Sequence, residues 1–312
     1  MTVDGTIVAA LAHFGLLQFA GADAQAFLQG QLSCDVAALA PGQATYGSYN
    51  TPKGRVLASF LLWRDEAGYT MQLPRSLCEP IRKRLSMYIM RSKVTAHDAS
   101  DDFCLIGVAG ASAQAVLQPL FPVLPAGPLT MTTTGRARLL QLESTRFLVV
   151  AAAGHGRELG NALGVSAATA SEATWDLTNI RAGIPFITPA TQDAFVPQMA
   201  NLDLIGGVSF TKGCYPGQEI VARMHYLGRL KQRMYVANIA GDAVAQPGDR
   251  LYSADTGDQA AGTIVSAAPS PDGGQDVLAV LQTASYGTGD VRLASLAGPK
   301  LKFFALPYKI PA

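Results

Sequence analysis

The first hundred residues predict an order of strands and helices that few folds can accommodate. The predicted elements are a strand over 16–20, a helix over 24–33, strands over 44–50, 55–63 and 69–73, a helix from 76 and a strand over 93–99. The strands are short apolar or aromatic runs bounded by turn residues such as T-P-K-G. This order is typical of a ferredoxin-like β-α-β-β-α-β unit with one added strand.

Both helices of this unit begin at residues that are typical of helix caps. Asp23 can cap the first helix with its carboxylate. Ser76 and Glu79 have the S-x-x-E spacing that predicts a capping box at the start of the second helix. Pro80 then lies in the first turn, where proline is tolerated because the N–H groups there have no partner within the helix.

A similar plan of elements recurs further along the chain. The predicted elements are a strand over 103–110, a helix over 112–120, a hairpin of 136–144 with 146–152, and a helix over 156–164. A helix that starts at Trp175 ends near Gly183, and an irregular stretch rich in turns follows. After Arg233 the chain contains only short β-runs separated by Gly, Pro and Asp, which are typical of a small antiparallel barrel.

We therefore predict an α+β protein with a domain boundary near Gln232. Residues 1–232 are expected to form two ferredoxin-like lobes, about 1–102 and 103–232, and residues 233–312 a small C-terminal antiparallel β-barrel. The composition agrees with several packed cores, because 49% of the 312 residues are hydrophobic and only 15% are charged.

The sequence predicts a cytoplasmic protein that makes no membrane contact. No run of about 18 apolar residues is present, so no transmembrane helix is expected. The apolar N-terminus has Asp4 where an export signal needs basic residues. The four cysteines, Cys34, Cys78, Cys104 and Cys214, form no C-x-x-C pair and have no histidine at ligand spacing. We therefore expect reduced thiols and no metal site.

Two runs of basic residues interrupt an otherwise balanced charge distribution. The net charge of +1 argues against a surface dedicated to nucleic acid. The runs consist of Arg75, Arg82, Lys83, Arg84, Arg91 and Lys93, with Glu79 as the only acid, and of Arg223, Arg229, Lys231 and Arg233, with none. Solvated helix faces explain either run alone. The two runs together leave open an anionic small ligand or a weak contact with tRNA.

The glycines of GHGRELG, at Gly154, Gly156 and Gly160, follow a predicted strand and precede a helix. This is the setting of a dinucleotide-binding fingerprint, but the spacing is G-x-G-x-x-x-G, one residue longer than the fingerprint requires. The flanking strands also indicate a hairpin and not a β-α-β crossover. A tight turn between strand and helix is the preferred interpretation.

The segment TKGCYPGQEIVAR places Cys214 just before a predicted helix over 218–227. The helix N-terminus and Lys212, two residues away, both favour the thiolate and lower the pKa of a cysteine from its usual value of about 8.5. The alternative is a small apolar residue that fills a turn, because unpaired cysteines are among the most buried residues.

Two pairs of side chains are expected to lie close together, one on the helix that follows this segment and one earlier in the chain. Glu219 and Arg223 stand at i,i+4 spacing and predict an ion pair on the helix surface. Trp175 and Arg181 can form one wall of a binding site, in which the ring stacks on a flat heterocycle and the guanidinium pairs with a carboxylate. A core tryptophan beside a surface arginine is the alternative.

Segments spread along the chain together resemble one known family. They are GADAQAFLQGQLSCDV, GSYNTPKGRVLASF, WDLTNIRAGIPFITPATQDAFVPQMANLDLIGGVSF and TKGCYPGQEIVAR. They resemble the YgfZ family of folate-binding proteins, relatives of the aminomethyltransferase known as the glycine-cleavage T-protein, and K-G-C-Y-x-G-Q-E is specific to that family. The resemblance implies two ferredoxin-like lobes and a C-terminal β-barrel around a channel that holds tetrahydrofolate. It also implies a role in assembling or repairing iron–sulfur clusters, including those of tRNA-modifying enzymes.

The resemblance also assigns roles to individual residues. The cysteine of the family motif is the one on which function depends, so Cys214 is the predicted catalytic residue, with Lys212 beside it. The residues expected to contact folate are Trp175, Arg181, Gln198, Tyr215, Gln218, Glu219 and Arg223. Iron–sulfur client or assembly proteins are the expected protein partners.

Two departures from the aminomethyltransferases argue against a glycine-cleavage enzyme. The stretch LPRSLCEPIRKRL lacks the aspartate of those enzymes and has Glu79 as its only acid. N-I-R-A-G stands where they have R-L-E-A-G, so Arg181 replaces a glutamate. Both changes remove proton-handling groups. A folate-dependent C1-transfer enzyme acting on an unknown amine stays open as the alternative, and the low net charge disfavours a dedicated tRNA-binding module.

Overall fold

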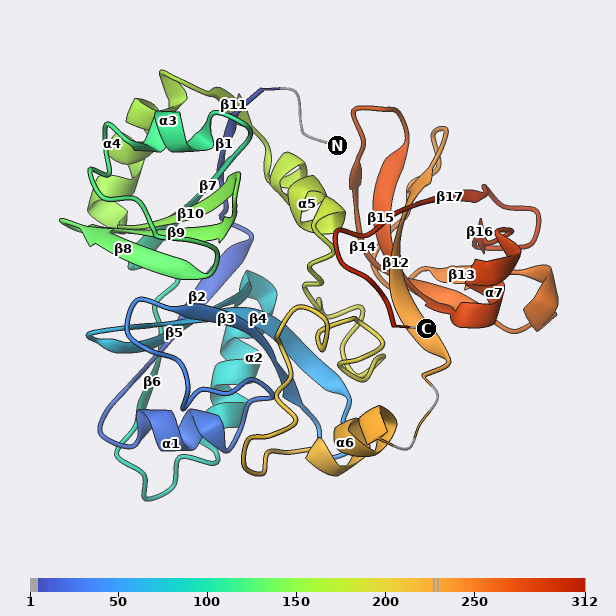
Figure 1. Ribbon diagram of the computed structural model, residues 1–312, viewed down its shortest axis with the longest axis horizontal. Helices are drawn as coiled ribbons and strands as arrows, with labels where there is room; N and C mark the ends of the chain where they lie inside the picture. The colour runs from blue at the N-terminus through green and yellow to red at the C-terminus, as the bar shows by residue number, and fades with distance from the viewer. Residues whose placement is uncertain (1–4, 227, 229, 312) are drawn as a thin grey trace. The chain divides into compact units, whose positions relative to one another are not determined.

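The computed structural model describes residues 5–226, 228 and 230–311, and Figure 1 shows it as a ribbon. The chain forms two compact units. The first unit comprises the residues up to Leu28, Val36–Thr45 and Phe60–Trp175. The second comprises Gln29–Asp35, Tyr46–Ser59 and the residues from Asp176 onward. Short early segments therefore join a unit that is built mainly from the C-terminal part of the chain.

One five-stranded sheet has the order β3-β4-β5-β2-β6. Its strands and the helices connected to them are β2 (Phe14–Ala20), α1 (Ala24–Gln29), β3 (Ala44–Asn50), β4 (Val56–Asp65), β5 (Gly68–Pro74), α2 (Arg75–Ser86) and β6 (Thr95–Asp98). Strand β2 pairs antiparallel with both β5 and β6, and β4 pairs antiparallel with β5. The predicted strands of this region are therefore confirmed, whereas α1 ends before Gly30 and is shorter than predicted.

The predicted capping box at the start of α2 is wrong. Helix α2 starts at Arg75 after Pro74, with no side-chain capping hydrogen bond. The Glu79 carboxylate instead pairs with Arg82 at 2.9 Å and Lys83 at 3.1 Å, because a charged partner one turn ahead binds a carboxylate more strongly than a neutral N–H does. The Asp23 carboxylate accepts a hydrogen bond of 2.7 Å from the backbone N–H of Lys93.

A six-stranded sheet of the first unit has the order β11-β1-β7-β10-β9-β8. Its strands and helices are β1 (Ile7–Ala10), β7 (Phe103–Ala109), α3 (Ala113–Leu117), β8 (Thr130–Thr134), β9 (Ala137–Glu143), β10 (Arg146–Ala152), α4 (Ala153–Gly164) and β11 (Ala168–Ala170). The predicted β9–β10 hairpin is confirmed. Strand β1 was not predicted, and it pairs antiparallel with β7 and parallel with β11. Phe121, Leu139 and Phe147 lie in the buried core that packs this sheet against its helices.

The glycines of GHGRELG lie inside α4 and do not form the predicted turn. A Cβ atom on Gly156 would come within 2.5 Å of the Cys104 Sγ. The segment is therefore a helix that packs closely on β7, and the glycine allows the close approach of helix and strand.

The C-terminal sheet has the order β16-β13-β14-β15-β12-β17 and curls into a half-barrel (Figure 1). Its elements are β12 (Gln232–Ile239), β13 (Arg250–Tyr252), β14 (Gly262–Pro269), β15 (Gln275–Gln282), α7 (Thr283–Thr288), β16 (Arg292–Leu293) and β17 (Leu301–Phe304). Every pairing given for this sheet is antiparallel, as predicted. Ile239, Leu251 and Val277 belong to its buried core.

A largely irregular stretch joins α5 (Glu172–Arg181) to α6 (Gln218–Tyr226). Gly183 ends α5 as predicted, with a φ of 69° and its carbonyl bonded by the Tyr308 hydroxyl at 2.8 Å. Ile187 and Phe195 from this stretch are buried in one core with residues of β12 and β15. Although it lacks regular structure, the stretch is thus anchored by apolar burial.

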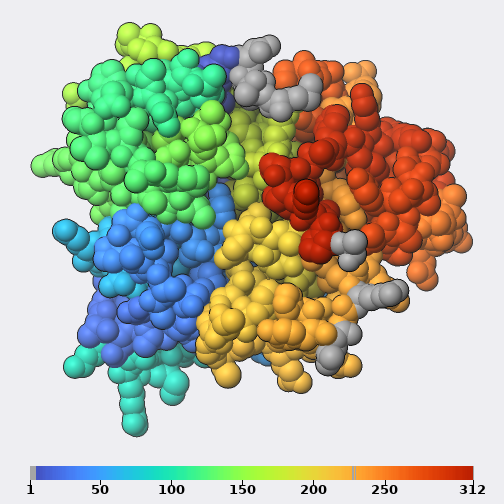
Figure 2. Space-filling view, in the orientation of Figure 1, coloured from blue at the N-terminus to red at the C-terminus, as the bar shows by residue number. Residues whose placement is uncertain are grey.

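The first basic run lies on α2 and on the turns that follow it. The segment after α2 projects from its unit, coloured teal in Figure 2. Met87 and Met90 are 66% and 87% exposed there, and Met90 has a φ of 44°. None of the helices that the structure describes is long and apolar enough to span a membrane.

Candidate functional site

Cys214 differs from the other three cysteines in its exposure to solvent. Cys34 and Cys78 are buried, and burial raises the pKa of their thiols to about 12 and about 11. Cys104 is partly covered, whereas Cys214 is exposed. The alternative that Cys214 is a buried residue filling a turn is therefore excluded. Because a thiol reacts as its thiolate and must be accessible, Cys214 is the best placed of the four for chemistry.

Lys212 holds the loop that carries Cys214. Its ammonium group donates hydrogen bonds to the backbone carbonyls of Gln29 at 2.6 Å, Leu32 at 2.6 Å and Cys34 at 3.0 Å. The residue is only 8% exposed, and burial lowers its pKa to about 8. An ammonium group has three N–H donors, so these three carbonyls use all of them. The geometry therefore supports a positioning role for Lys212.

Tyr215 lies on the other side of Cys214 and is buried. Its backbone N–H donates to the Gln218 Oε1 at 3.2 Å, and its ring lies 5.0 Å from the Lys212 Nζ. Burial raises the pKa of its hydroxyl to about 12, and this hydroxyl has no hydrogen-bond partner among the described residues. The residues on both sides of the exposed thiol are thus held in place.

Gly217 packs the motif against the turn between β3 and β4. It has a φ of 80°, and a Cβ atom there would lie 2.5 Å from the Thr51 oxygen and 2.6 Å from the Gly54 Cα. Only glycine satisfies both the left-handed backbone and this close approach. Gly217 therefore packs the loop of residues 211–217, which carries Cys214 and is called the thiol loop below, against the turn that contains Thr51 and Gly54.

Helix α6 follows at Gln218 and places Cys214 four residues ahead of its first turn, as predicted. Glu219 and Arg223 are both exposed on it, and the structure shows no ion pair between these two residues, so that predicted pair is wrong. Exposed pairs gain little because water screens them and ordering two long side chains costs entropy. The predicted end at residue 227 lies outside the described residues.

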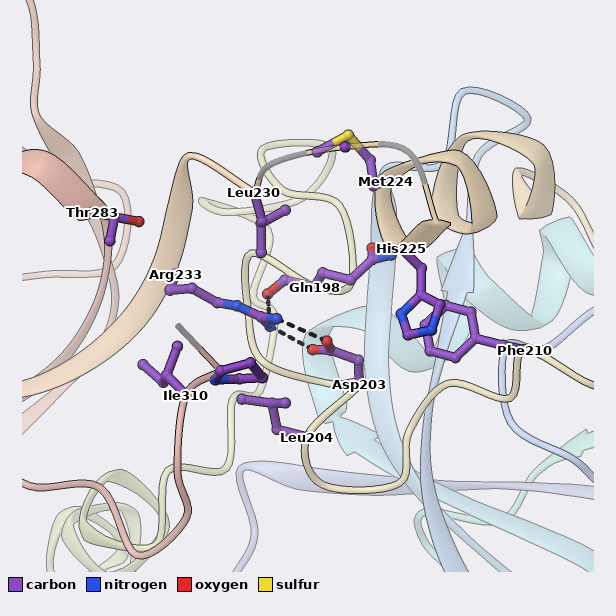
Figure 3. Close-up of a pocket in the computed structure, with 12 residues that line it drawn as sticks. Gln198, Asp203, Leu204, Phe210, Met224, His225, Leu230, Arg233, Thr283 and Ile310 are labelled. Carbon is purple, nitrogen blue, oxygen red and sulfur yellow. Dashed lines mark hydrogen bonds and ion pairs between the residues drawn. The ribbon is translucent and has the colours of Figure 1, made fainter.

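A cavity of about 640 Å³ lies beside the C-terminal half of α6 (Figure 3). It is lined by Gln198, Asp203, Leu204, Phe210, Met224, His225, Gly228, Leu230, Arg233, Thr283, Ile310 and Pro311. The rings of Phe210 and His225 stack with their centroids 3.8 Å apart and their planes at 15°. The cavity and the exposed thiol therefore lie toward opposite ends of one helix.

Buried polar groups form another part of the cavity wall. Arg233 donates to both carboxylate oxygens of Asp203, at 2.7 and 3.0 Å, and to the backbone oxygen of Gln198 at 2.8 Å (Figure 3). The Gln198 Nε2 donates to the Val221 carbonyl of α6 at 2.6 Å, while its Oε1 has no partner in the described part of the chain. Gln198 thus connects the cavity to the helix that follows the thiol loop.

Trp175 and Arg181 each have local partners in the structure. The Trp175 ring is buried, with the Arg146 guanidinium 5.2 Å from its centroid. Arg181 donates to Asp276 at 2.8 Å and to Asp272 at 3.1 Å. Trp175 is therefore a core residue. The positive charge of Arg181 is neutralised by the two aspartates of the second unit. Its expected pairing with a ligand carboxylate is weakened by the two acids.

Sequence reasoning did not identify the cavity. Gln198 was the only predicted folate contact that lines it, and Asp203, Phe210 and His225 were not singled out. Their spacing of five, seven and fifteen residues matches no single helix or strand, so no periodic signal was available. Within the described residues, no group of three or more His, Cys, Asp or Glu side chains could hold a metal ion.

Comparison with known proteins identifies the class defined by this fold. The GCVT N-terminal domain matches residues 2–177. The crystal structure of the glycine cleavage system aminomethyltransferase T from Bartonella henselae superimposes with a TM-score of 0.75, covering 98% of this chain and 87% of that chain at 15% identity. The protein therefore has the fold of aminomethyltransferase T.

The family follows from closer relatives. The tRNA-modifying protein YgfZ of Klebsiella pneumoniae is 33% identical over 96% of this chain and 92% of its own length. The protein of the same name from Escherichia coli K12 is 36% identical over 76% of this chain and 72% of its own length. The chain belongs to the YgfZ family.

Proposed function

We propose that this protein binds a reduced folate and supports the assembly or repair of iron–sulfur clusters through the thiol of Cys214, in the cytoplasm and with tRNA-modifying enzymes among its clients. The observation that carries the proposal is an exposed thiol between two anchored neighbours. Lys212 is bound by three carbonyls and Tyr215 is buried, so Cys214 is held in place and still reaches solvent. The name tRNA-modifying protein, which the relatives carry, supports the choice of clients.

The residues of the second unit fit a folate. A pterin ring is flat and carries several N–H groups, and both the Gln198 Oε1 and the Tyr215 hydroxyl are buried polar atoms without a partner among the described residues. The cavity beside α6 has a volume typical of small-molecule sites. We expect Gln198 and Tyr215 to be among the folate contacts. A bound reduced folate would supply a carrier for one-carbon units.

The alternative is C1 transfer from an unknown amine, which the likeness to aminomethyltransferase T favours. Such an enzyme needs a group that moves protons. Glu79 is the only acid in the stretch where those enzymes have their aspartate, and hydrogen bonds from Arg82 and Lys83 lower its pKa. A carboxylate stabilised in this way is a weak base. We therefore prefer the accessory function.

A cysteine substitution tests the proposal. Cys214→Ser should keep the fold and the affinity for tetrahydrofolate, yet fail to restore iron–sulfur enzyme activity in cells that lack the protein. Cys104→Ser is the matched control, because Cys104 is the next most accessible thiol. If Cys214→Ser fully restored iron–sulfur enzyme activity, the thiol would not be required for the function.

A turnover assay separates the two functions. Purified protein is incubated with tetrahydrofolate and candidate methylated amines, and methylene-tetrahydrofolate is measured. The accessory function predicts no turnover. Turnover by both the wild type and Cys214→Ser would favour the C1-transfer enzyme.

A further inference from the structure

A smaller cavity, of about 250 Å³, lies where the irregular stretch after α5 meets the C-terminal sheet. Ala194 and Phe195 of that stretch line it, together with Gln232 of β12, Arg250 of β13 and Thr263 of β14. All of these residues belong to the second unit. Among the described residues, Arg250 is the only charged residue that lines this cavity.

The strand register places the polar side chains of the cavity on one face of the sheet. Arg250 stands opposite Thr263, and Thr263 stands opposite Val280 of β15. Val280 in turn stands opposite Met234 of β12, which is two residues from Gln232. Residues directly opposite on antiparallel strands share a face, as do residues i and i+2 of one strand. Gln232, Thr263 and Arg250 therefore converge on the cavity from three strands.

These three side chains are not used elsewhere within the described chain. No hydrogen bond or ion pair is present for the Arg250 guanidinium, the Gln232 amide or the Thr263 hydroxyl among the described residues. Phe195 and Val280, which also line the cavity, are buried and apolar. The polar contacts of a ligand would therefore come from the three side chains, and a charge is attracted more strongly beside an apolar surface than in bulk water.

Arg250 differs in this respect from three other arginines of the second unit. Arg181, Arg233 and Arg292 are each paired with an aspartate. Their charges are thus compensated within the protein, whereas Arg250 is exposed and has no acidic partner in the described part of the chain. The guanidinium of Arg250 is therefore free to bind an anion.

A second guanidinium adds positive potential at the cavity wall. The Arg55 Nη1 donates to the Ala194 carbonyl at 2.7 Å, and the described residues include no ion pair of Arg55. Asp193 and Asp249, the acids next to two of the lining residues in sequence, do not line the cavity themselves. The Asp249 carboxylate accepts the backbone N–H of Gln246 at 2.8 Å. The cavity therefore favours a negatively charged ligand.

We propose that this cavity binds a phosphoryl group, as free phosphate or as a small phosphate monoester. The planar Arg250 guanidinium can pair with two oxygens at once. The Thr263 hydroxyl and the Gln232 amide supply further donors from two other strands, so a tetrahedral group can use more of the donors than a planar carboxylate with two oxygens. A volume of about 250 Å³ limits the ligand to a small molecule. This site is separate from the cavity beside α6, and the proposal does not rest on the proposed function.

Titrations followed by nuclear magnetic resonance test the site. The amide chemical shifts of the full-length protein are recorded with increasing inorganic phosphate, methyl phosphate or acetate, at constant pH and ionic strength. Phosphate or methyl phosphate should shift the amides of residues 190–195, 248–250 and 262–263 along a curve that saturates. Acetate, as the planar anion, should bind more weakly.

Three variants assign the binding to individual side chains. Arg250→Gln removes charge-assisted hydrogen bonds and should weaken binding about tenfold or more. Thr263→Val removes one neutral hydrogen bond, keeps the β-branched shape and should weaken binding about two- to tenfold. Arg292→Gln is the matched control, because Arg292 lies in the same sheet, is paired with Asp290 and does not line the cavity. Its affinity for phosphate should equal that of the wild type.

The outcomes separate the sources of the phosphoryl group and decide the proposal. Loss of binding in Arg250→Gln but not in Arg292→Gln supports the site, and the tighter of the two phosphates identifies a free ion or a monoester. Equal weakening in both arginine variants would reveal an effect of net charge alone and overturn the proposal. Acetate binding as tight as phosphate binding, or no shift of the cavity amides at millimolar phosphate, would overturn it as well. None of these results bears on Cys214 or on folate, so the proposed function stands or falls separately.

Discussion

At the scale of single residues, Lys212 shows how a buried cation can organise the loop that carries Cys214. Its ammonium joins 211–217 to the backbone of the segment around Leu32, which is far away in sequence. Because carbonyl oxygens and not carboxylates surround it, the charge stays incompletely compensated, and burial lowers its pKa to about 8. The same contacts that fix Cys214 thus make the loop sensitive to pH.

Replacing this residue should destabilise the protein in a pH-dependent way. Lys212→Met leaves three buried carbonyls without a donor, which costs roughly 1–3 kcal/mol of unfolding free energy. Between pH 8 and the unfolded value of 10.5, the unfolded chain binds a proton at Lys212 that the folded chain has lost, so the wild type gains stability as pH rises. The difference in the free energy of unfolding between the wild type and the variant should therefore increase from pH 7 to pH 9.

Denaturant unfolding at the two pH values measures this gap. Lys53→Met is the control, since Lys53 is an exposed lysine of the same unit. The comparison stops at pH 9 because burial raises the folded pKa of Cys34, and this thiol contributes with the opposite sign as the pH passes its unfolded value of 9.0. A gap that is equal at both pH values would contradict the burial argument.

At the scale of elements, the contact between the start of α6 and the β3–β4 turn depends on two glycines. Gly217 and Gly54 both have a positive φ, of 80° and 72°, and their backbones touch. This contact, together with the Lys212 bonds, determines where α6 begins. The position of the thiol is therefore a property of three chain segments and not of the motif alone.

Gly217→Ala should break this contact. The added Cβ meets backbone atoms of Thr51 and Gly54, and alanine is strained at a φ of 80°, so we expect a loss of about 1–3 kcal/mol in the free energy of unfolding or more. Gly213→Ala, on the same loop with nothing within 4 Å, should have little effect. Equal losses in the two variants, measured by denaturant unfolding, would show that the contact does not matter.

At the scale of the whole molecule, the four thiols differ in their exposure to solvent. Cys34 and Cys78 are buried, Cys104 is partly covered and Cys214 is exposed. We predict that iodoacetamide labels Cys214 first, Cys104 more slowly, and Cys34 and Cys78 only after unfolding. Mass spectrometry of native and guanidinium-treated protein gives the order. Rapid native labelling of Cys34 would mean that the segment bound by Lys212 opens readily.

The sequence by itself determined the order of most strands and helices, the antiparallel C-terminal sheet and the family. These depend on local patterns of apolar residues, on turn residues and on a contiguous motif, all of which can be followed along the chain.

Only the tertiary structure decided that Cys214 is exposed, that Lys212 is bound by carbonyls near Leu32, and that Glu79 pairs with basic residues in place of capping α2. The cavity of Phe210, His225 and Gln198 also became visible only in three dimensions. The physical reason is that burial, close backbone approach and the competition for hydrogen-bond partners depend on segments that are distant in sequence and meet only in the folded chain.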